Sequence, residues 1–265
     1  MDHSAAVGAV RKHLDRDFDR LGAQGWGRAD ADASERVSRE VHRRFLRRFV
    51  PRGARVLEIG AGANRFTTEL AARGCRVVVT DPSSARLAAH ERRVRGTPAE
   101  RSVLRREVLD ATDVSRYADG EFDALLAYGS PLSAVYGCAA EVLRGLLRVV
   151  APDGVVVASV LSLLGSWRQH PPGLDGSIGG DADGETARRY RWSEVVSLVD
   201  EAGGELVDGS ASNWASAGDP GSLALLAADR DRWRRFVEHE VAACAEPGAR
   251  DGGTHILFAA RPLVE

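Results

Sequence analysis

Apolar side chains recur at helical spacing over residues 32–49. Asp32 followed by Glu35 has the form of a capping box, which satisfies the unpaired N–H groups at a helix start. Pro51 ends the pattern because proline cannot continue a helix. The periodicity therefore predicts an amphipathic helix that buries one stripe of side chains: Val37, Val41, Phe45 and Phe49.

Beyond Pro51 the apolar residues come in short continuous runs. Runs of this kind, with helical patterns between them, are typical of buried strands in a parallel sheet. We expect strands at residues 55–59, 75–81, 102–110, 122–128, 154–161, 205–211 and 254–260. Helical patterns fall at 67–73, 139–150, 192–202 and 229–245. This alternation predicts a Rossmann-like α/β fold, in which a doubly wound, mostly parallel sheet carries helices on both faces.

Two connections are longer than the short loops that are usual in compact domains. They are residues 162–191, rich in Gly, Pro and Asp, and residues 212–253, which contain the last helical pattern. Connections of this length are often functional. We therefore divide the chain into an N-terminal helical segment, residues 1–50, that caps the site, and one domain, residues 51–265, that carries the two insertions.

Charge and composition narrow the possible functions. The 265 residues hold 38 acidic and 36 basic side chains, so the chain as a whole lacks the positive charge of a nucleic-acid binder. The arginine run at positions 43, 44, 47 and 48 is interpreted as a solvated helix face. No apolar stretch is long and uncharged enough to span a bilayer, and the first residues lack the apolar core of a secretory signal. We expect a cytoplasmic protein without membrane contact.

The cysteines do not form a recognisable framework. There are three of them, far apart in the sequence and without the paired spacing of a zinc site. An odd number also argues against a set of disulfides. We expect small buried apolar side chains at these positions, and no metal site.

The turn after the first strand carries the most specific chemistry. Its sequence is Glu58-Ile59-Gly60-Ala61-Gly62-Ala63-Asn64-Arg65, and a helical pattern follows. Asp81 ends the next strand 19 residues after Gly62, a separation at which an acid reaches the hydroxyls of a ribose. Backbone groups of Gly60 and Gly62 can approach a ligand closely because neither residue has a Cβ. The combination predicts a nucleotide-type ligand.

A nicotinamide dinucleotide fits this turn poorly. Counted from Gly60, the third glycine of its fingerprint falls at Arg65, whose side chain would obstruct close helix packing. Read as E-x-G-x-G-x-G, the turn instead resembles motif I of the class I S-adenosylmethionine-dependent methyltransferases, with Asn64 in the third glycine place. Asn tolerates positive φ, so this departure is mild. The resemblance continues in register to residue 161, through VVVTDPS, LDATD, FDALLAYGSPLSAV and LLRVVAPDGVVVASV.

The resemblance implies S-adenosylmethionine as cofactor and S-adenosylhomocysteine as its product. Asp81 would hold both ribose hydroxyls, and Pro82 would pack on the adenine. Asp110 and Ala111 would contact the adenine edge through a carboxylate and a backbone amide. Glu58, beneath the turn, would accept hydrogen bonds from the ligand amine or from turn amides. The expected cofactor-binding residues are Glu58, Gly60, Ala61, Gly62, Asn64, Asp81, Pro82, Asp110, Ala111 and Tyr128.

The acceptor is expected outside the carboxyl ends of the parallel strands. Tyr128 and Ser130 follow the fourth strand at that edge. The resemblance implies an antiparallel last strand between the fifth and sixth, which would turn His255 toward the site. Trp214 and Trp233 would either enclose an apolar acceptor or pack the second insertion onto the sheet. No histidine has a defining sequence neighbour, so the candidates for a catalytic base are His170, His239 and His255.

Together these features predict an enzyme that moves a methyl group to an oxygen or nitrogen of a small molecule in specialised-metabolite biosynthesis. Proximity and orientation supply much of the rate of such a displacement, and a base is needed only when the acceptor must lose a proton. The alternatives are an RNA or protein methyltransferase, a non-methylating S-adenosylmethionine-binding protein or cyclase of the same fold, and a nicotinamide oxidoreductase.

Overall fold

The computed structural model describes residues 33–62, 66–135, 137–169 and 187–263. In this part of the chain one sheet has the strand order β3-β2-β1-β4-β5-β8-β7, and the short strand β6 pairs with β5 off that path. The strands are β1 Arg55–Ile59, β2 Arg76–Asp81, β3 Val103–Val108, β4 Phe122–Ala127, β5 Val150–Ser162, β6 Arg189–Tyr190, β7 Gly204–Ser212 and β8 His255–Pro262.

All neighbouring pairs are parallel except those made by β8, which runs antiparallel between β5 and β7. The expected doubly wound sheet with an antiparallel last strand is thus confirmed. The strand order reverses at β1, where β2 and β3 lie on one side and β4 on the other. A reversal of this kind opens a crevice at the carboxyl ends of the strands, which is where ligands bind in open α/β sheets.

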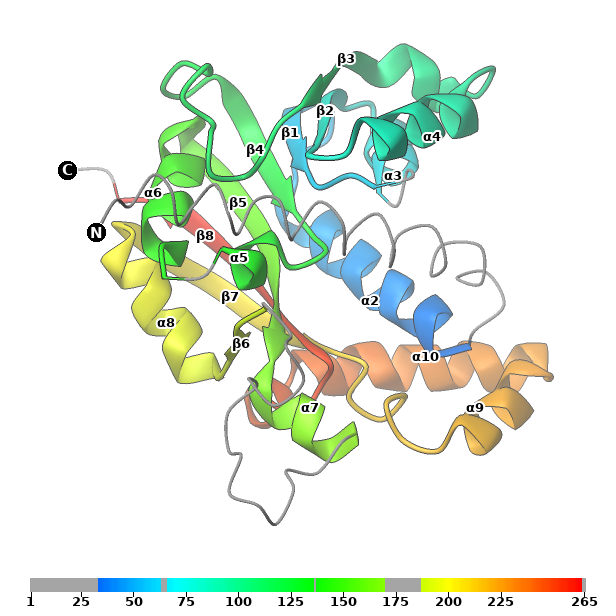
Figure 1. Cartoon of the computed structure of the whole chain (residues 1–265). Coiled ribbons are helices and arrows are strands. Elements are labelled where there is room, and N and C mark those ends of the chain that lie inside the picture. Colours follow the sequence, from blue (N-terminus) through cyan, green and yellow to red (C-terminus); the bar gives the residue numbers. More distant parts are fainter. Residues whose placement is uncertain (1–32, 63–65, 136, 170–186, 264–265) are drawn as a thin grey trace.

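Helices cover both faces of the sheet (Figure 1). They are α2 Ala33–Phe49, α3 Thr67–Ala72, α4 Ser84–Val94, α5 Pro131–Ala134, α6 Ala139–Arg148, α7 Leu163–Gln169, α8 Trp192–Glu201, α9 Pro220–Ala227 and α10 Arg230–Ala245, with 3-10 turns at Pro98–Ser102 and Pro247–Ala249. The apolar patterns predicted α2, α3, α6, α8 and α10 to within two residues at most ends. They did not predict α4, α5, α7, α9 or the strand β6.

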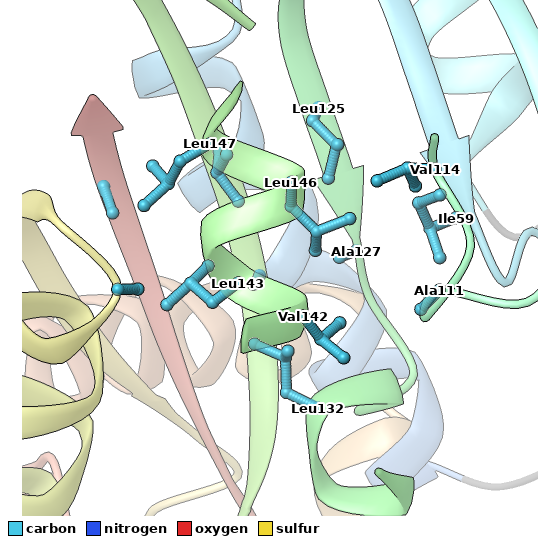
Figure 2. Close-up of a cluster of buried hydrophobic side chains, with 14 of the residues drawn as sticks. Ile59, Ala111, Val114, Leu125, Ala127, Leu132, Val142, Leu143, Leu146 and Leu147 are labelled. Carbon is cyan, nitrogen blue, oxygen red and sulfur yellow. The ribbon is translucent and has the colours of Figure 1, made fainter. Parts of the chain in front are cut away.

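The core on one face forms where α6 meets the central strands. Leu143 and Leu146 of α6 are fully buried, and they belong to the same apolar cluster as Ile59 of β1 and Leu125 of β4. Figure 2 shows Leu146 on the side of α6 that faces Ala127 and Leu125 of β4. Neighbouring residues of β4 point to the opposite face, so the strand is buried on both sides and reads as a continuous apolar run.

The second core lies beneath α2. Val37, Val41 and Phe45 are buried as the helical spacing predicts, and they pack with Val56 of β1 and Leu126 of β4. Phe49 lies at the edge of this cluster. Asp32, the expected cap, is outside the described residues. The α2 helix therefore forms part of the main fold and covers the sheet beside the strand-order reversal.

The two insertions contain secondary structure of their own. Residues 162–191 begin with α7 and end at β6, and their glycine-rich middle lies outside the described residues. Residues 212–253 hold α9 and α10, which pack against α2 and each other (Figure 1). Asp219 and Asp229 cap the two helices by accepting backbone N–H groups. The second insertion thus extends the helical layer that α2 begins.

The composition raised questions about membrane-spanning helices, metal sites and cysteines, and the described residues provide an observation on each. No helix there has the length and apolar character needed to cross a membrane. Within the same ranges no cluster of side chains is suited to a metal ion. The three cysteines are unpaired thiols, two of them buried.

Candidate active site

The turn that follows β1 is shaped by its glycines. Gly60 has φ of 67° and Gly62 has φ of 57°, in the left-handed region that L side chains adopt at a cost. The Ala61 N–H donates to the Thr80 carbonyl oxygen at 3.0 Å. The Gly62 N–H donates to Oδ2 of Asp81 at 2.9 Å. The turn is therefore fixed to the end of β2 by two hydrogen bonds.

Asp81 is the charged residue at the centre of this turn. Its side chain is completely buried at the carboxyl end of β2. While Oδ2 accepts from Gly62, Oδ1 accepts the Ser83 N–H at 2.9 Å, next to the start of α4. A carboxylate accepts up to about four hydrogen bonds, so a carboxylate fixed in this way can serve the backbone and a ligand diol together.

Glu58 lies below the turn in a buried polar chain. Thr67 of α3 donates its hydroxyl to Oε2 of Glu58 at 2.6 Å. The Thr67 oxygen lies 2.8 Å from Nε2 of His90, and Arg106 donates to Nδ1 of the same ring at 3.2 Å. This order of donors requires a neutral His90 protonated on Nε2. Burial, with Arg106 beside it, lowers the pKa of His90 to about 4, which keeps the ring neutral.

The pKa of Glu58 is shifted in the opposite direction. Complete burial raises it to about 7, with a smaller contribution from the nearby Asp81 charge and against the hydrogen bond from Thr67. A carboxylate with this pKa changes charge near neutral pH, beside a backbone turn that can receive a ligand. Perturbed groups in such positions are typical of functional sites.

We expect Glu58→Gln to stabilise the protein at pH 8 but not at pH 5. The unfolded acid loses its proton near its usual pKa of 4.5, whereas the folded one keeps it to about 7. Stability is therefore lost as pH rises through this window, because the unfolded state gains free energy by releasing a proton that the folded state still holds. The gain from removing the carboxyl at pH 8 is at most about 3 kcal/mol.

Urea unfolding of both proteins at the two pH values measures this difference. The control is Glu91→Gln, which neutralises an exposed acid on α4. An equal effect of Glu58→Gln at pH 5 and pH 8 would show that the Glu58 carboxyl titrates normally.

The segment after β4 is held in an unusual backbone conformation. Gly129 has φ of 85°, and Ser130 has φ of 61°, which is uncommon for a residue with a side chain. The Ser130 N–H donates to Oγ of Ser159 at 3.3 Å. Ser130 Oγ itself is buried without a hydrogen-bond partner in the part of the chain that the structure describes. A buried, unpartnered hydroxyl on a strained turn is suited to a polar ligand atom.

Tyr128 connects this segment to α2. Its hydroxyl donates to the His42 carbonyl oxygen at 3.1 Å, and its ring meets the His42 ring edge to face at 4.7 Å between centroids. The Phe66 ring, just after the glycine turn, stacks on His42 at 5.8 Å. The His255 ring from the start of β8 lies 5.9 Å from the His42 ring. Four rings thus meet at the carboxyl edge of the sheet.

His42 is a site residue that the sequence analysis missed. It is buried, and its Nδ1 lies 2.8 Å from the Ser38 carbonyl oxygen one turn earlier in α2. In the sequence, the signal that could have identified His42 is a pair of polar residues, Ser38 and His42, four positions apart beside the apolar stripe of α2. Such a pair is also compatible with a structural role, and only the approach of Tyr128 and His255 distinguishes it.

The other expected site residues fall into three groups. Asp110 and Ala111 lie just beyond β3, where Leu109 bonds to the Asp81 carbonyl, and Asp110 accepts the Thr112 N–H at 2.9 Å as a turn residue does. His239 is exposed on α10. The positions of Asn64 and His170 lie outside the described residues. The structure therefore brings together the expected residues of the first, second and fourth strand ends, with His255.

The two tryptophans of the second insertion lie apart. Trp233 packs under Arg36 of α2, whose guanidinium is 4.4 Å from the ring centroid, and beside Phe236. Arg36 and His42 are six residues apart and so lie on different sides of the helix. Trp214 follows Ser212, whose Oγ is 3.4 Å from Nδ1 of His42. Of the two, Trp214 is connected more directly to the site.

The arginine run of α2 is neutralised by neighbouring acids. Arg44 pairs with Glu40 and with Glu238 of α10, and Arg47 pairs with Glu69 of α3. The other two arginines of the run also form ion pairs, Arg43 with Glu40 and Arg48 with Asp208. This surface is therefore a network of ion pairs, as a solvated helix face would be, and does not present a band of unpaired positive charge.

Comparisons with known proteins agree with this geometry. Residues 57–156 match a family model described as a methyltransferase domain. A structure of Burkholderia thailandensis 1,6-didemethyltoxoflavin-N1-methyltransferase with S-adenosylhomocysteine is 18% identical, with a TM-score of 0.58 over 100% of this chain and 92% of that one. The 4+2 cyclase SpnF is 20% identical, with a TM-score of 0.58 over 86% of this chain and 82% of the cyclase.

A third similar structure is a putative methyltransferase in complex with the Haloferax volcanii Trm112 methyltransferase activator. It is 17% identical, with a TM-score of 0.62 over 95% of this chain and 99% of that one. The search of curated proteins gives no match. At these identities the structural likenesses establish the fold, and the family model identifies the domain that contains the glycine turn, Asp81 and Tyr128.

Proposed function

We propose that this chain is a class I S-adenosylmethionine-dependent methyltransferase whose acceptor is a small molecule methylated on oxygen or nitrogen in specialised-metabolite biosynthesis. One observation carries the proposal: the rings of His42, Phe66, Tyr128 and His255 meet beside the glycine turn. Aromatic rings beside the turn provide an apolar boundary, which suits a compact, mostly apolar acceptor better than a polymer crossing an open surface.

The described residues fit the cofactor. The turn at Gly60 and Gly62 has no Cβ to obstruct a ligand, and Asp81 is held at the end of β2, where we expect the ribose diol. Glu58 would place a negative charge near the ligand ammonium and sulfonium. Asp110 and Ala111 would border the adenine, with Pro82 packed on its face.

When bound, S-adenosylmethionine supplies an electrophilic methyl group. The chain's own residues would bind the cofactor, orient the acceptor and exclude water. Tyr128 lies against both the cofactor turn and α2, and Ser130 follows it two residues later, so we assign the two residues to the boundary between cofactor and acceptor. Orienting an acceptor atom in line with the methyl carbon supplies much of the rate.

Two alternatives keep specific support. The Trm112-bound neighbour is relevant to an RNA or protein methyltransferase, but the ion-paired arginine run of α2 gives little support to a polyanion. The similarity to a 4+2 cyclase is relevant to a protein of this fold that does not transfer methyl groups.

These functions are distinguished by which class of molecule receives a labelled methyl group. The protein is incubated with methyl-labelled S-adenosylmethionine and, separately, with small metabolites, total tRNA and protein from its host cells. We expect label in the metabolite fraction. Label in tRNA or protein would overturn the small-molecule acceptor. Binding of S-adenosylhomocysteine with no label in any fraction would favour the non-methylating alternative.

We expect Trp214→Ala to raise KM for the labelled acceptor about 5- to 20-fold without changing cofactor affinity, because Trp214 follows two residues after Ser212, which contacts His42. The matched variant is Trp233→Ala. It is expected to lower the free energy of unfolding by about 1–2 kcal/mol through lost packing on α2, with little change in KM. Steady-state kinetics and urea unfolding measure both effects. The reverse pattern would assign the acceptor boundary to Trp233.

A further inference from the structure

We infer that Glu58 releases a proton when the cofactor binds, and that Thr67 and His90 are positioning residues that support the charged carboxylate this leaves. The inference rests on the proposed function and adds a pH dependence to its first step, the binding of S-adenosylmethionine or S-adenosylhomocysteine. Three features of the buried chain from Arg106 to Glu58 support it.

The hydrogen bonds of this chain run in one direction. Arg106 can only donate, so Nδ1 of His90 accepts from it at 3.2 Å and the ring proton lies on Nε2. Nε2 then donates to the Thr67 oxygen, 2.8 Å away, and Thr67 keeps its own proton for Oε2 of Glu58 at 2.6 Å. Every link therefore directs a donor toward the Glu58 carboxyl. A hydrogen bond to the charged form of an acid stabilises that form, so the chain supports a carboxylate at its end.

His90 stays neutral over the pH range in which Glu58 titrates. A second ring proton would place an N–H on Nδ1, which faces the N–H of Arg106. Burial, with the charge of Arg106 beside it, lowers the pKa of His90 to about 4. A change of charge in this chain near neutral pH therefore belongs to Glu58.

The surroundings of Glu58 lack a compensating positive charge in the part of the chain that the structure describes. Its side chain is buried, and its partners in register on the neighbouring strands are apolar, Val79 of β2 and Leu126 of β4. Asp81 at the end of β2 adds a like charge, and Arg106 of β3 is separated from the carboxyl by two side chains. Burial without a counter-charge favours the protonated acid, and the pKa of Glu58 is raised to about 7.

The missing counter-charge is one that the ligand carries. Glu58 precedes Gly60 by two residues, and the turn that follows is fixed by the bond from Gly62 to Asp81. The cofactor has an ammonium group, and its methylated form also has a sulfonium. A positive charge that enters beside the turn favours the Glu58 carboxylate, so the O–H bond of the acid breaks and its proton passes to water. The buried carboxylate then faces a cation in place of its proton.

Cofactor affinity should therefore rise with pH and level off above the pKa of Glu58. Below about 7 binding must expel a proton, which becomes less favourable as the pH falls, whereas above it the free protein already holds the carboxylate. We expect affinity for S-adenosylhomocysteine to increase about 10- to 30-fold between pH 5.5 and pH 8. At pH 6, binding should release about 0.5–0.9 proton.

Calorimetry with S-adenosylhomocysteine measures both quantities. Titrations at pH 6 in phosphate and in imidazole buffer give the number of protons released, because the two buffers differ in ionisation enthalpy. In Glu58→Gln the release should fall below about 0.2 proton, and affinity should vary less than about 3-fold over the same pH range. Glu91→Gln, which neutralises an exposed acid on α4, should behave as wild type.

Thr67→Val tests the positioning role. Valine lacks the hydroxyl, so the charged form of Glu58 loses its hydrogen bond and the midpoint of the pH–affinity curve should move up by about 1 pH unit. Thr67→Ser keeps the hydroxyl and should hold the midpoint within about 0.3 unit. His90→Phe should shift it in the same direction as Thr67→Val. The control is Thr68→Val, which makes the same change at an exposed position of α3 and should leave the midpoint unchanged.

The possible outcomes separate the inference from the proposed function. A wild-type protein that binds S-adenosylhomocysteine at pH 6 without releasing a proton would overturn the inference, as would a release that persists in Glu58→Gln. An equal loss of affinity at every pH in Thr67→Val would show that Thr67 has only a structural role. A wild type that binds neither S-adenosylmethionine nor S-adenosylhomocysteine would instead refute the proposed function.

Discussion

Asp81→Ala is expected to reduce affinity for S-adenosylhomocysteine about 30- to 1,000-fold, equivalent to about 2–4 kcal/mol. The variant removes the carboxylate that we propose as acceptor for two ribose hydroxyls. It also removes the hydrogen bonds that fix the turn, since Asp81 accepts the backbone N–H groups of Gly62 and Ser83. Isothermal calorimetry on the folded variant measures the loss.

The comparison with Asp81→Asn separates the two roles. Asparagine keeps one carbonyl oxygen and can retain one of the backbone bonds, so we expect an intermediate affinity and a smaller loss of thermal stability. Unchanged ligand affinity in a folded Asp81→Ala protein would show that Asp81 supports only the turn.

Gly62→Val is expected to abolish measurable cofactor binding, a loss of more than about 100-fold. Gly62 has φ of 57°, and a β-branched side chain is strained there by more than the 1–2 kcal/mol typical of other residues. Relief of that strain would move the N–H that contacts Asp81. The valine side chain would also occupy the space through which a ligand can approach the backbone when residue 62 is glycine.

Gly96→Val is the matched control. Gly96 has φ of 74° and no heavy atom within 4 Å of the position its Cβ would take, and it lies in the exposed loop after α4. It should show a comparable loss of stability with full cofactor affinity. If both variants lost affinity equally, the effect of Gly62→Val would be general destabilisation and not a local clash.

The sequence predicted the sheet because its strands are short apolar runs separated by clear turns. The parallel strands β1, β2 and β4 are buried on both faces, and so their hydrophobicity is strong enough to identify them. The helix α4 was missed because its apolar face is narrow: only Leu87, His90 and Val94 are buried. The α9 helix was missed because it is apolar without a stripe, in a segment that pattern alone could not assign.

The cofactor half of the site was predictable for a different reason. Glu58, Gly60 and Gly62 lie within five residues of one another and Asp81 follows 19 residues after Gly62, so their arrangement can be predicted from local spacing. No comparable local spacing in the sequence indicates a role for His42. Its role depends on Tyr128 and on His255, more than 200 residues later in the sequence, and only the fold brings these three together.

The buried chain of hydrogen bonds that runs from Arg106 to Glu58 also cannot be predicted from the sequence. Thr67 and His90 are ordinary helix residues by spacing, and each becomes informative only when Thr67 is seen within 2.6 Å of the Glu58 carboxylate. Burial, which raises the pKa of Glu58, is likewise a property of the assembled fold.

The contacts between α2 and the second insertion affect how this protein can change during evolution. Asn213 donates to the Ser34 carbonyl oxygen at 2.9 Å, and Ser212 contacts His42, so the two flanks of the domain meet at the proposed acceptor side, next to Tyr128. The cofactor side comes from the intervening stretch, which the family model spans at 57–156. Under this proposed division, mutation or recombination in the flanks would alter the acceptor while the residues assigned to the methyl donor stay unchanged. New substrate ranges are accordingly most accessible through paired changes in α2 and in residues 212–255.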